Sequence, residues 1–383
     1  MTADDPETRA RIWLSGVFEP GDPVAAQLLS QFPAIAVLER ILSASPDEQS
    51  RFGDWRARAR RTDDERLLDT AAAVGARYVA PGDPEWPSTL GDLDTHGGGG
   101  RWNPAPLGLW VRGAANLATV TEQSVAIVGS RAATAYGEQV ARDLAFACAG
   151  LRWTLVSGGA YGIDAAAHRG ALACGQPTVA VLAGGVDRAY PSGNAALLRD
   201  IADSGLLVSE AAPGAAPTKS RFLVRNRLIA ALSAGTVVVE AALRSGSLST
   251  ARWARDLGRS VMGVPGLVTS MASAGVHELL REPETVLITE ASEIVAQVGP
   301  IEATRRERWP AADRAEDSLP ADTRRVLDGV PAGWAVPAET VAREAGVRPS
   351  AAASELRELE RRGLVVRCGR GWALASPPGG ERG

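Results

Sequence analysis

The sequence predicts an α/β protein whose core is an extended, doubly wound and mostly parallel sheet. Between residues 107 and 300, short apolar runs rich in Val, Ile and Leu alternate with Ala-rich amphipathic segments. The runs are continuously apolar, which is typical of strands that helices cover on both faces. Because strands and helices alternate along the chain, we interpret this region as a Rossmann-like domain built of βαβ units.

Each expected strand is followed by a loop or by the start of a helix. The expected strands lie at residues 124–128, 154–156, 178–182, 206–208, 236–239, 261–264 and 286–289. Gly, Ser and Pro follow most of these runs, as expected where a strand ends in a loop. The segments between them have apolar residues at helical spacing.

The flanking regions have a different pattern. Residues 1–95 look helical and show no obvious strand, so they form a separate N-terminal domain in our interpretation. Residues 96–300 are then the core, beginning with a Gly-rich stretch at 96–100, and residues 301–318 are a charged linker. Residues 319–383 indicate a winged helix, with helices at 322–327, 338–345 and 350–362 and hairpin strands at 364–367 and 372–374.

Composition excludes several classes of protein. The three cysteines and three histidines are widely spaced, so we expect neither a disulfide scaffold nor a metal site. No apolar run is long enough to cross a membrane, and residues 1–10 lack the apolar segment of a secretory signal. We therefore expect a cytoplasmic protein with no membrane contact. A net charge of −4 argues against a generally basic nucleic-acid coat.

Gly, Ser and Arg gather after the expected strands. Gly129-Ser130-Arg131 follows the first strand, Gly158-Gly159 follows the second, and Ser245-Gly246-Ser247 comes shortly after the fifth. Because the carboxyl ends of parallel strands meet at one edge of a sheet, these loops converge there. Glycine permits close backbone approach, and loop amides that precede a helix attract anions. We therefore expect a phosphate-bearing ligand at this edge.

Several ligand and enzyme classes lack their motifs. No G-x-G-x-x-G follows the first strand, which argues against a dinucleotide site. An ATPase phosphate loop needs glycine before Lys219-Ser220, where Thr218 stands. No G-x-S-x-G elbow is present, and no spacing nominates a catalytic triad. We expect no cofactor and no catalytic residue.

Local charge between residues 217 and 260 differs from that of the whole chain. Here eight Lys or Arg side chains stand against two acidic ones. Four of them, including Lys219, the only lysine of the chain, lie at the start of an expected helix and oppose its dipole. A bound anion would offset that cost, and a solvated basic face is the alternative. Phe222 stands among these cations and either stacks on a base or packs in the core.

These motifs, taken in order over residues 108–298, resemble those of the DNA-processing protein A family (DprA, also called Smf). Several motifs at compatible spacing make the resemblance specific. They are Val125-Ala126-Ile127-Val128-Gly129-Ser130-Arg131, Ser157-Gly158-Gly159-Ala160-Tyr161-Gly162-Ile163-Asp164, Gly184-Gly185-Val186-Asp187 with Tyr190-Pro191 and Asn194, Arg225-Asn226-Arg227 after Phe222, Ser245-Gly246-Ser247, and Val264-Pro265-Gly266.

The resemblance implies a single-stranded DNA-binding protein that protects incoming DNA and loads the RecA recombinase in natural transformation and recombination. It also implies a homodimer without established catalytic activity, an N-terminal domain of the SAM or helix-hairpin-helix type, and a C-terminal winged helix. We expect function to have retained Lys219. By motif match, the expected DNA-binding residues are Gly129, Ser130, Arg131, Thr134, Gly158, Gly159, Lys219, Phe222, Arg225, Asn226, Arg227, Ser245 and Ser247.

Two other classes of function stay open. A nucleotide or phosphoribose hydrolase would use Glu240, although Ser233-Ala234-Gly235-Thr236 replaces the Gly-rich loop of such enzymes. A winged-helix transcription regulator would read duplex DNA through residues 349–362, where three glutamates balance three arginines. Release of free base from nucleotides would identify the first class. A sequence preference of residues 319–383 for one duplex would identify the second.

Overall fold

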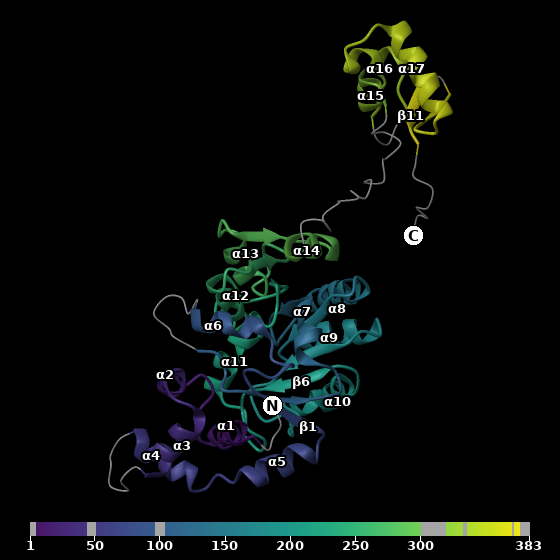
Figure 1. Ribbon diagram of the computed structural model, residues 1–383. Coiled ribbons are helices and arrows are strands. Elements are labelled where there is room, and N and C mark those ends of the chain that lie inside the picture. The colour runs from purple at the N-terminus through teal and green to yellow at the C-terminus, as the bar shows by residue number, and fades with distance from the viewer. Residues whose placement is uncertain are drawn as a thin grey trace. The chain divides into compact units, whose positions relative to one another are not determined.

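A computed structural model describes residues 5–43, 51–95, 104–299, 319–331, 335–369 and 371–375 (Figure 1). Two compact units are present, Met1–Thr304 and Arg305–Gly383. The Gly-rich stretch at 96–100 and the expected linker at 301–318 lie outside the described residues. None of the described helices combines the length and the apolar character needed to cross a membrane.

The first unit begins with helices and continues as an alternation of strands and helices. The strands are β1 (Ala76–Val79), β2 (Leu109–Arg112), β3 (Ser124–Val128), β4 (Thr154–Ser157), β5 (Thr178–Val181), β6 (Leu206–Ser209), β7 (Gly235–Val238), β8 (Ser260–Gly263) and β9 (Thr285–Leu287). The helices are α1 (Pro6–Val17), α2 (Pro23–Gln31), α3 (Ala34–Ser43), α4 (Arg51–Ala59), α5 (Asp64–Ala72), α6 (Asp92–Thr95), α7 (Leu117–Glu122), α8 (Ala135–Gly150), α9 (Ile163–Ala173), α10 (Ala195–Ser204), α11 (Lys219–Ala231), α12 (Ser247–Asp256), α13 (Ala274–Leu280) and α14 (Ala291–Val298), with 3₁₀ turns η1 (Ser88–Gly91) and η2 (Ser192–Asn194).

The strands form one mixed, mostly parallel sheet in the order β1-β2-β6-β5-β4-β3-β7-β8-β9. From β6 to β9 all neighbours pair in parallel, whereas β1 and β2 add an antiparallel edge beyond β6. The parallel part of the sheet starts at β3; the chain adds β4 to β6 on one side of it and then returns to place β7 on the other. The switch point of the winding therefore lies between β3 and β7, where open α/β sheets bind their ligands.

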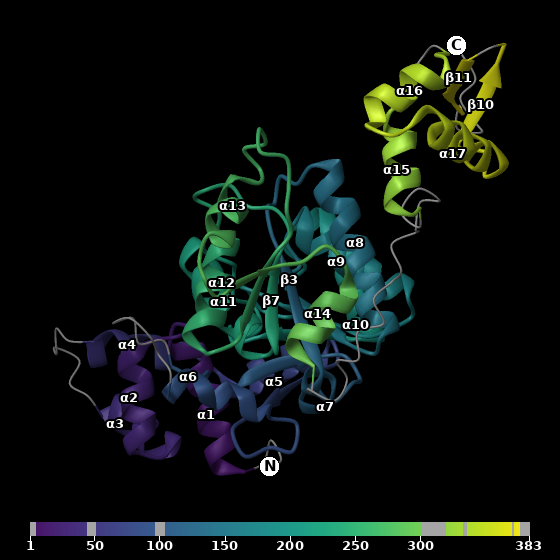
Figure 2. The same cartoon turned by 90° about the horizontal axis from the view of Figure 1, so that it is seen from above.

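Helices cover both faces of the sheet, as expected for strands that are buried along their whole length. Figure 2 shows β3 and β7 between α11 and α12 on one side and α8 and α9 on the other. Leu228 and Ala254 belong to the apolar core on the first side. Leu144 and Ile163 belong to the core on the second side. The predicted Rossmann-like fold is confirmed.

The N-terminal region departs from the expectation that residues 1–95 contain no strand. Ala76–Val79 forms β1 and pairs antiparallel with β2, so this part of the chain contributes to the sheet. The strand is short and only its last residue is buried, which leaves little apolar pattern to detect. Helices α1 to α4 pack around Leu14, Val37 and Trp55. An ion pair of 3.0 Å between Arg221 of α11 and Glu19, just after α1, links these helices to the rest of the unit.

The second unit contains three helices followed by a hairpin. These are α15 (Ala321–Asp328), α16 (Ala338–Ala345), α17 (Pro349–Arg361), β10 (Val365–Cys368) and β11 (Gly371–Leu374). Val326, Leu356 and Trp372 lie in its own apolar core. This is the element order from which we infer a winged helix.

Candidate nucleic-acid interface

A cavity of about 690 Å³ lies at the carboxyl edge of the sheet, beside the switch point between β3 and β7. Its walls come from the loops after β3, β4 and β5, from the first turns of α11, and from the segment that joins β7 to α12. Most of the expected site residues line it, namely Gly129, Ser130, Arg131, Lys219, Phe222, Arg225, Asn226, Ser245 and Ser247.

Helix α11 brings the cations and the aromatic ring into this cavity. It begins at Lys219 because Thr218 caps it, accepting a hydrogen bond from the Arg221 amide at 3.3 Å. The Phe222 ring lies one turn on, and the guanidinium carbon of Arg131 sits 4.4 Å from its centroid. Within the described residues, neither Arg131 nor Lys219 forms an ion pair. Both charges are therefore available to an anion.

Arg225 and Asp164 form the floor of the cavity. Both side chains are buried, and Arg225 donates hydrogen bonds to the carbonyl oxygens of Gly158, at 2.8 Å, and Val181. Its Nε is buried without a partner among the described residues. Burial lowers the pKa of Arg225 to about 10, so the group still carries its charge at neutral pH. Burial also raises the pKa of Asp164, and the charge of Arg225 opposes that shift.

The segment before α12 supplies backbone and hydroxyl groups to the opposite wall. Asn226 donates to the Gly246 carbonyl oxygen at 3.1 Å and so fixes this segment against α11. The hydroxyls of Ser245 and Ser247 are 2.8 Å apart. The Ser247 amide donates to the Ser245 hydroxyl at 3.4 Å, and the Ser249 amide donates to the Gly246 carbonyl oxygen at 3.0 Å, so groups of the segment itself hold the start of α12.

Four of the expected residues lie outside the cavity. Gly158 and Gly159 follow β4 beneath the floor, and Gly158 only accepts a hydrogen bond from Arg225. Thr134 caps α8, accepting from the Gly137 amide at 3.1 Å. Arg227 is fully buried and pairs with Glu210 at 2.9 Å, on the far side of α11. Residues two apart on a helix do not share a face, so Arg225 and Arg227 cannot both reach one cavity.

Glu240 is a structural residue in this fold. Its carboxylate is buried at the start of α8, where it accepts from the Thr134 amide at 2.9 Å and the Thr134 hydroxyl at 2.5 Å. The N-terminus of this helix is the place where a Rossmann-like fold binds a ligand's pyrophosphate. Because Glu240 fills that place and does not line the cavity, the residue expected to serve a hydrolase is unavailable to a substrate there.

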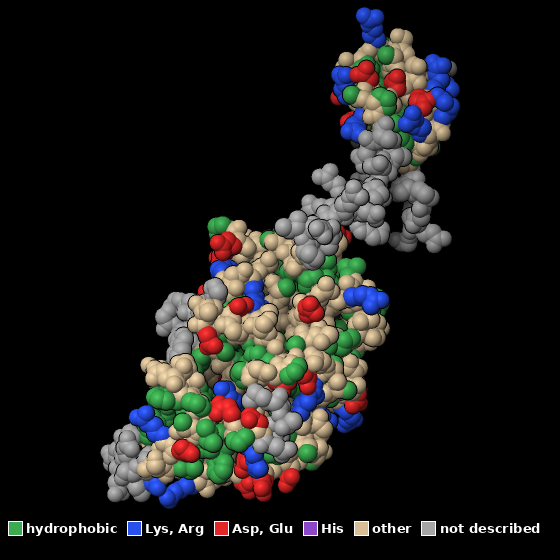
Figure 3. Space-filling model, viewed as in Figure 1, with side chains coloured by type: hydrophobic (Ala, Val, Ile, Leu, Met, Phe, Trp, Pro, Cys, Tyr) green, Lys and Arg blue, Asp and Glu red, His purple; other side chains and the backbone are tan. Residues whose placement is uncertain are grey.

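The basic segment at residues 217–260 is partly neutralised. Four of its arginines have acidic partners, which are Glu19 for Arg221, Glu210 for Arg227, Glu282 for Arg255 and Asp92 for Arg259. Figure 3 shows acidic and basic side chains interspersed on the face of the first unit that it presents. Of the four basic residues of this segment that form no ion pair among the described residues, Lys219, Arg225 and Arg244 line the cavity, and Arg252 does not.

Sequence reasoning missed two exposed residues of the cavity wall. Tyr190 comes from the loop after β5 and lies 5.8 Å from the Phe222 ring, centroid to centroid. Arg244 follows β7 and is exposed. Both stand shortly after a strand in the sequence, which was the signal available for finding them.

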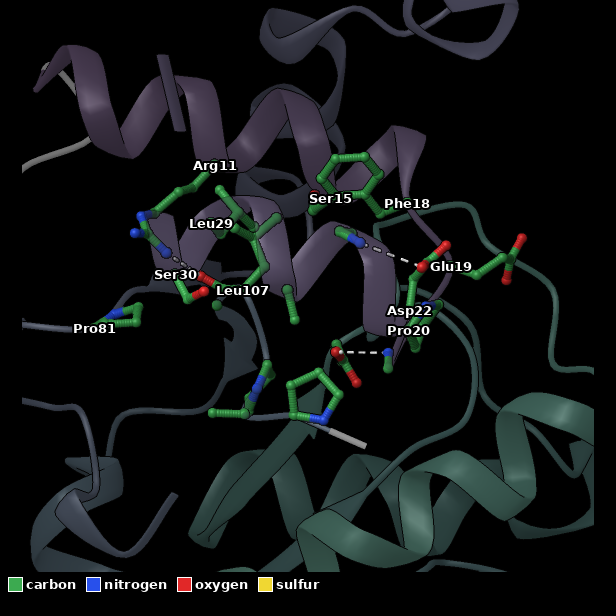
Figure 4. A pocket seen from close by; sticks show the side chains of 18 of the residues that line it. Arg11, Ser15, Phe18, Glu19, Pro20, Asp22, Leu29, Ser30, Pro81 and Leu107 are labelled. Atoms are coloured by element: carbon green, nitrogen blue, oxygen red, sulfur yellow. Dashed lines mark hydrogen bonds between the residues drawn. The ribbon is translucent and has the colours of Figure 1, made fainter. Parts of the chain in front are cut away.

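A second cavity, of about 380 Å³, lies where the N-terminal helices meet the sheet. Figure 4 shows it between the helices that carry Arg11 and Leu29 and the segment that carries Leu107, and Phe18, just after α1, also lines it. Glu210 also lines it and accepts from the Gly21 amide at 3.1 Å. No expected site residue lines this cavity.

Fold and site together define a Rossmann-like protein whose binding pocket lies at the switch point of a mostly parallel sheet and combines cations with an aromatic ring. A sequence profile of the DNA recombination-mediator protein A family matches residues 77–299, and the chain belongs to that family. It is 43% identical over 386 residues to a protein of Mycobacterium tuberculosis named for DNA processing, DprA, and the match covers 97% of each chain.

Two solved structures share the fold. DNA processing protein A from Streptococcus pneumoniae superimposes with a TM-score of 0.61 and 29% identity, covering 76% of this chain and 97% of that one. DNA processing protein A from Helicobacter pylori, whose structure was described for its single-stranded DNA binding mode, gives a TM-score of 0.50 and 29% identity. It covers 57% of this chain and 94% of that one.

Proposed function

We propose that the cavity at the switch point binds single-stranded DNA. The observation that carries the proposal is that Arg131 and Lys219, which form no ion pair among the described residues, line one cavity with Phe222. Cations that track the backbone and rings that stack on bases are the two parts of sequence-tolerant single-strand sites. Membership of a recombination-mediator family and the DNA-binding relative from H. pylori support the same ligand.

Each group has a distinct part in this proposal. Arg131, Lys219 and the hydroxyls of Ser245 and Ser247 hold phosphates, and the buried Arg225 supplies a fixed positive potential beneath them. Phe222 stacks on a base. Because contacts to phosphates and stacking on a ring do not distinguish one base from another, we expect weak dependence on sequence.

The wider role follows from the family. We propose that the chain protects incoming single-stranded DNA in the cytoplasm and loads the RecA recombinase on it, acting as a homodimer and without catalysing a reaction. The pocket, the buried position of Glu240 and the family membership support this role.

A salt-varied titration tests the proposed ligand. The affinity for a single-stranded oligonucleotide should exceed that for duplex DNA of matched length. In Arg131→Ala/Lys219→Ala, the slope of log affinity against log salt should fall by about 0.7 for each phosphate that the variant no longer neutralises. The matched control is Arg152→Ala/Arg169→Ala, which removes the same charge from exposed positions outside the cavity. Equal binding by the two double variants would refute the pocket assignment.

A further inference from the structure

Tyr190 lines the cavity from the loop after β5. Half of its surface is exposed (50%). The chain has four tyrosines, and Tyr190 is the one whose hydroxyl has no hydrogen-bond partner among the described residues. Its ring instead leans on Phe222, with the two planes at 49°. The two rings therefore form a continuous aromatic surface that runs from the cavity to its outer edge.

The loop that presents Tyr190 is held by hydrogen bonds on three sides. Asn194 is buried and donates to the carbonyl oxygens of Gly159, at 3.1 Å, and Ala160, at 3.0 Å. The Gly193 amide donates to the Tyr161 hydroxyl at 3.2 Å. On the other side, Asp187 accepts from the Gly214 amide at 2.8 Å. An exposed ring on a fixed loop loses little conformational freedom when it binds, which favours a contact surface.

The position of Tyr190 gives the aromatic surface a direction. Phe222 comes from α11, and Tyr190 comes from the loop after β5, so the surface extends from the cavity toward the carboxyl end of β5. On the opposite side, toward β8, the exposed Tyr136 donates its hydroxyl to the Pro265 carbonyl oxygen at 2.8 Å and does not line the cavity. An aromatic ring therefore lines the cavity on the β5 side, whereas the tyrosine on the β8 side lies outside it.

We propose that Tyr190 is a second base-stacking site and that the DNA strand leaves the cavity across it, on the β5 side of the sheet. This inference rests on the proposed function. The occupant is the nucleotide next to the one held at Phe222. Ring contact is sequence-tolerant, because every base presents a π-face. Tyr190 touches no phosphate in this arrangement, so its contribution is independent of salt.

Fluorescence anisotropy with a labelled oligothymidylate of about 16 nucleotides tests the proposal. Tyr190→Ala should weaken binding about tenfold, and Tyr190→Phe should bind like the wild type, because it keeps the ring. The salt slope should be the same in all three proteins. Tyr190→Leu keeps an apolar side chain of similar size and should behave like Tyr190→Ala. Thermal unfolding of each variant reports whether the loop itself has been damaged.

Tyr136→Ala is the matched control, because Tyr136 is equally exposed (50%) and lies outside the cavity. It should bind like the wild type. Oligonucleotides carrying 5-iodouracil should crosslink to Tyr190 under ultraviolet light and not to Tyr136. Wild-type affinity in Tyr190→Ala, or crosslinking at Tyr136 alone, overturns the proposal while single-strand binding stands. Failure of the wild type to bind single-stranded DNA overturns both.

Discussion

The guanidinium of Arg131 lies over the ring of Phe222, with its central carbon 4.4 Å from the ring centroid. In the free protein this contact covers the ring face that the proposed ligand needs for stacking. A cation–π contact at a partly exposed site contributes about 0.5–2 kcal/mol. An ion pair between Arg131 and a DNA phosphate can offset the loss of this contact. Because Arg131 forms no ion pair among the described residues, it is free to leave the ring and meet the DNA backbone.

Variants at position 131 can distinguish the role of the positive charge from the role of the planar guanidinium group. Arg131→Lys keeps the charge that meets a phosphate but loses the planar group that covers Phe222. We expect its salt slope for single-stranded DNA to equal that of the wild type. Arg131→Ala should lower the slope by about 0.7, because one phosphate is then left without its cation. A titration over several salt concentrations measures both, and a lowered slope in Arg131→Lys would contradict the assignment.

Arg227 should matter for stability rather than for DNA. Its side chain is fully buried, donates to the Pro104 carbonyl oxygen at 3.1 Å and pairs with Glu210 at 2.9 Å. Arg227→Met leaves the largely covered Glu210 carboxylate without its cation, so we expect a loss of about 3 kcal/mol in the free energy of unfolding. Urea denaturation measures this loss.

The comparison variant for Arg227 is Arg244→Ala, at an exposed arginine of the cavity wall. We expect its free energy of unfolding to change by less than about 0.5 kcal/mol. Folded Arg227→Met should keep the wild-type salt slope for single-stranded DNA. A lowered slope would mean that Arg227 does contact a DNA phosphate.

Gly158 should not tolerate a side chain, because it supports the floor of the cavity. A Cβ at this position would lie 2.6 Å from both Nη2 of Arg225 and Oδ2 of Asp164. We expect Gly158→Ala to displace Arg225, to cost about 1–3 kcal/mol in the free energy of unfolding and to weaken single-strand binding. The control is Gly91→Ala, where a Cβ meets nothing within 4 Å. Equal stability of the two variants would show that the floor adapts.

The core strands could be predicted from sequence because they are buried on both faces and therefore apolar throughout. The expected strands from residue 124 onward all occur, with ends shifted by at most two residues. The two antiparallel edge strands were missed for a physical reason. β1 has only one buried residue. β2 has four residues, of which the first three are buried, and so short an apolar run does not distinguish a strand from a piece of helix.

Some residues of the site could likewise be predicted from the local sequence, whereas others are placed only by the fold. Arg131, Lys219 and Phe222 were predictable because each lies directly after a strand or at the start of a helix on the carboxyl edge. Arg227 was misplaced because local charge does not say which face of α11 meets the core. Tyr190 stands in one of the quoted motifs but was not assigned to the site, because only the folded loop brings its ring to Phe222. Their contact with DNA stays a prediction for all of them.

His168 should make the protein sensitive to acid. Its ring is fully buried, its Nδ1 lies 2.8 Å from the Thr178 hydroxyl, and its Nε2 has no partner among the described residues. Burial lowers its pKa to about 3, with the charges of Arg225 and Arg169 adding to the shift. Between about pH 6.5 and 3, the unfolded chain therefore binds a proton that the folded chain excludes.

The free energy of unfolding should consequently decrease as the pH is lowered through this range, by about 1.4 kcal/mol per pH unit from His168 alone. Asp164 acts in the opposite sense, because its raised pKa means that the folded chain gains stability as this carboxyl is protonated. The difference between the wild type and His168→Gln isolates the histidine, since both proteins carry Asp164. Urea denaturation at several pH values should show the wild type losing stability relative to His168→Gln as the solution is acidified. Parallel curves for the two proteins would mean that the folded state protonates His168 as readily as the unfolded chain does.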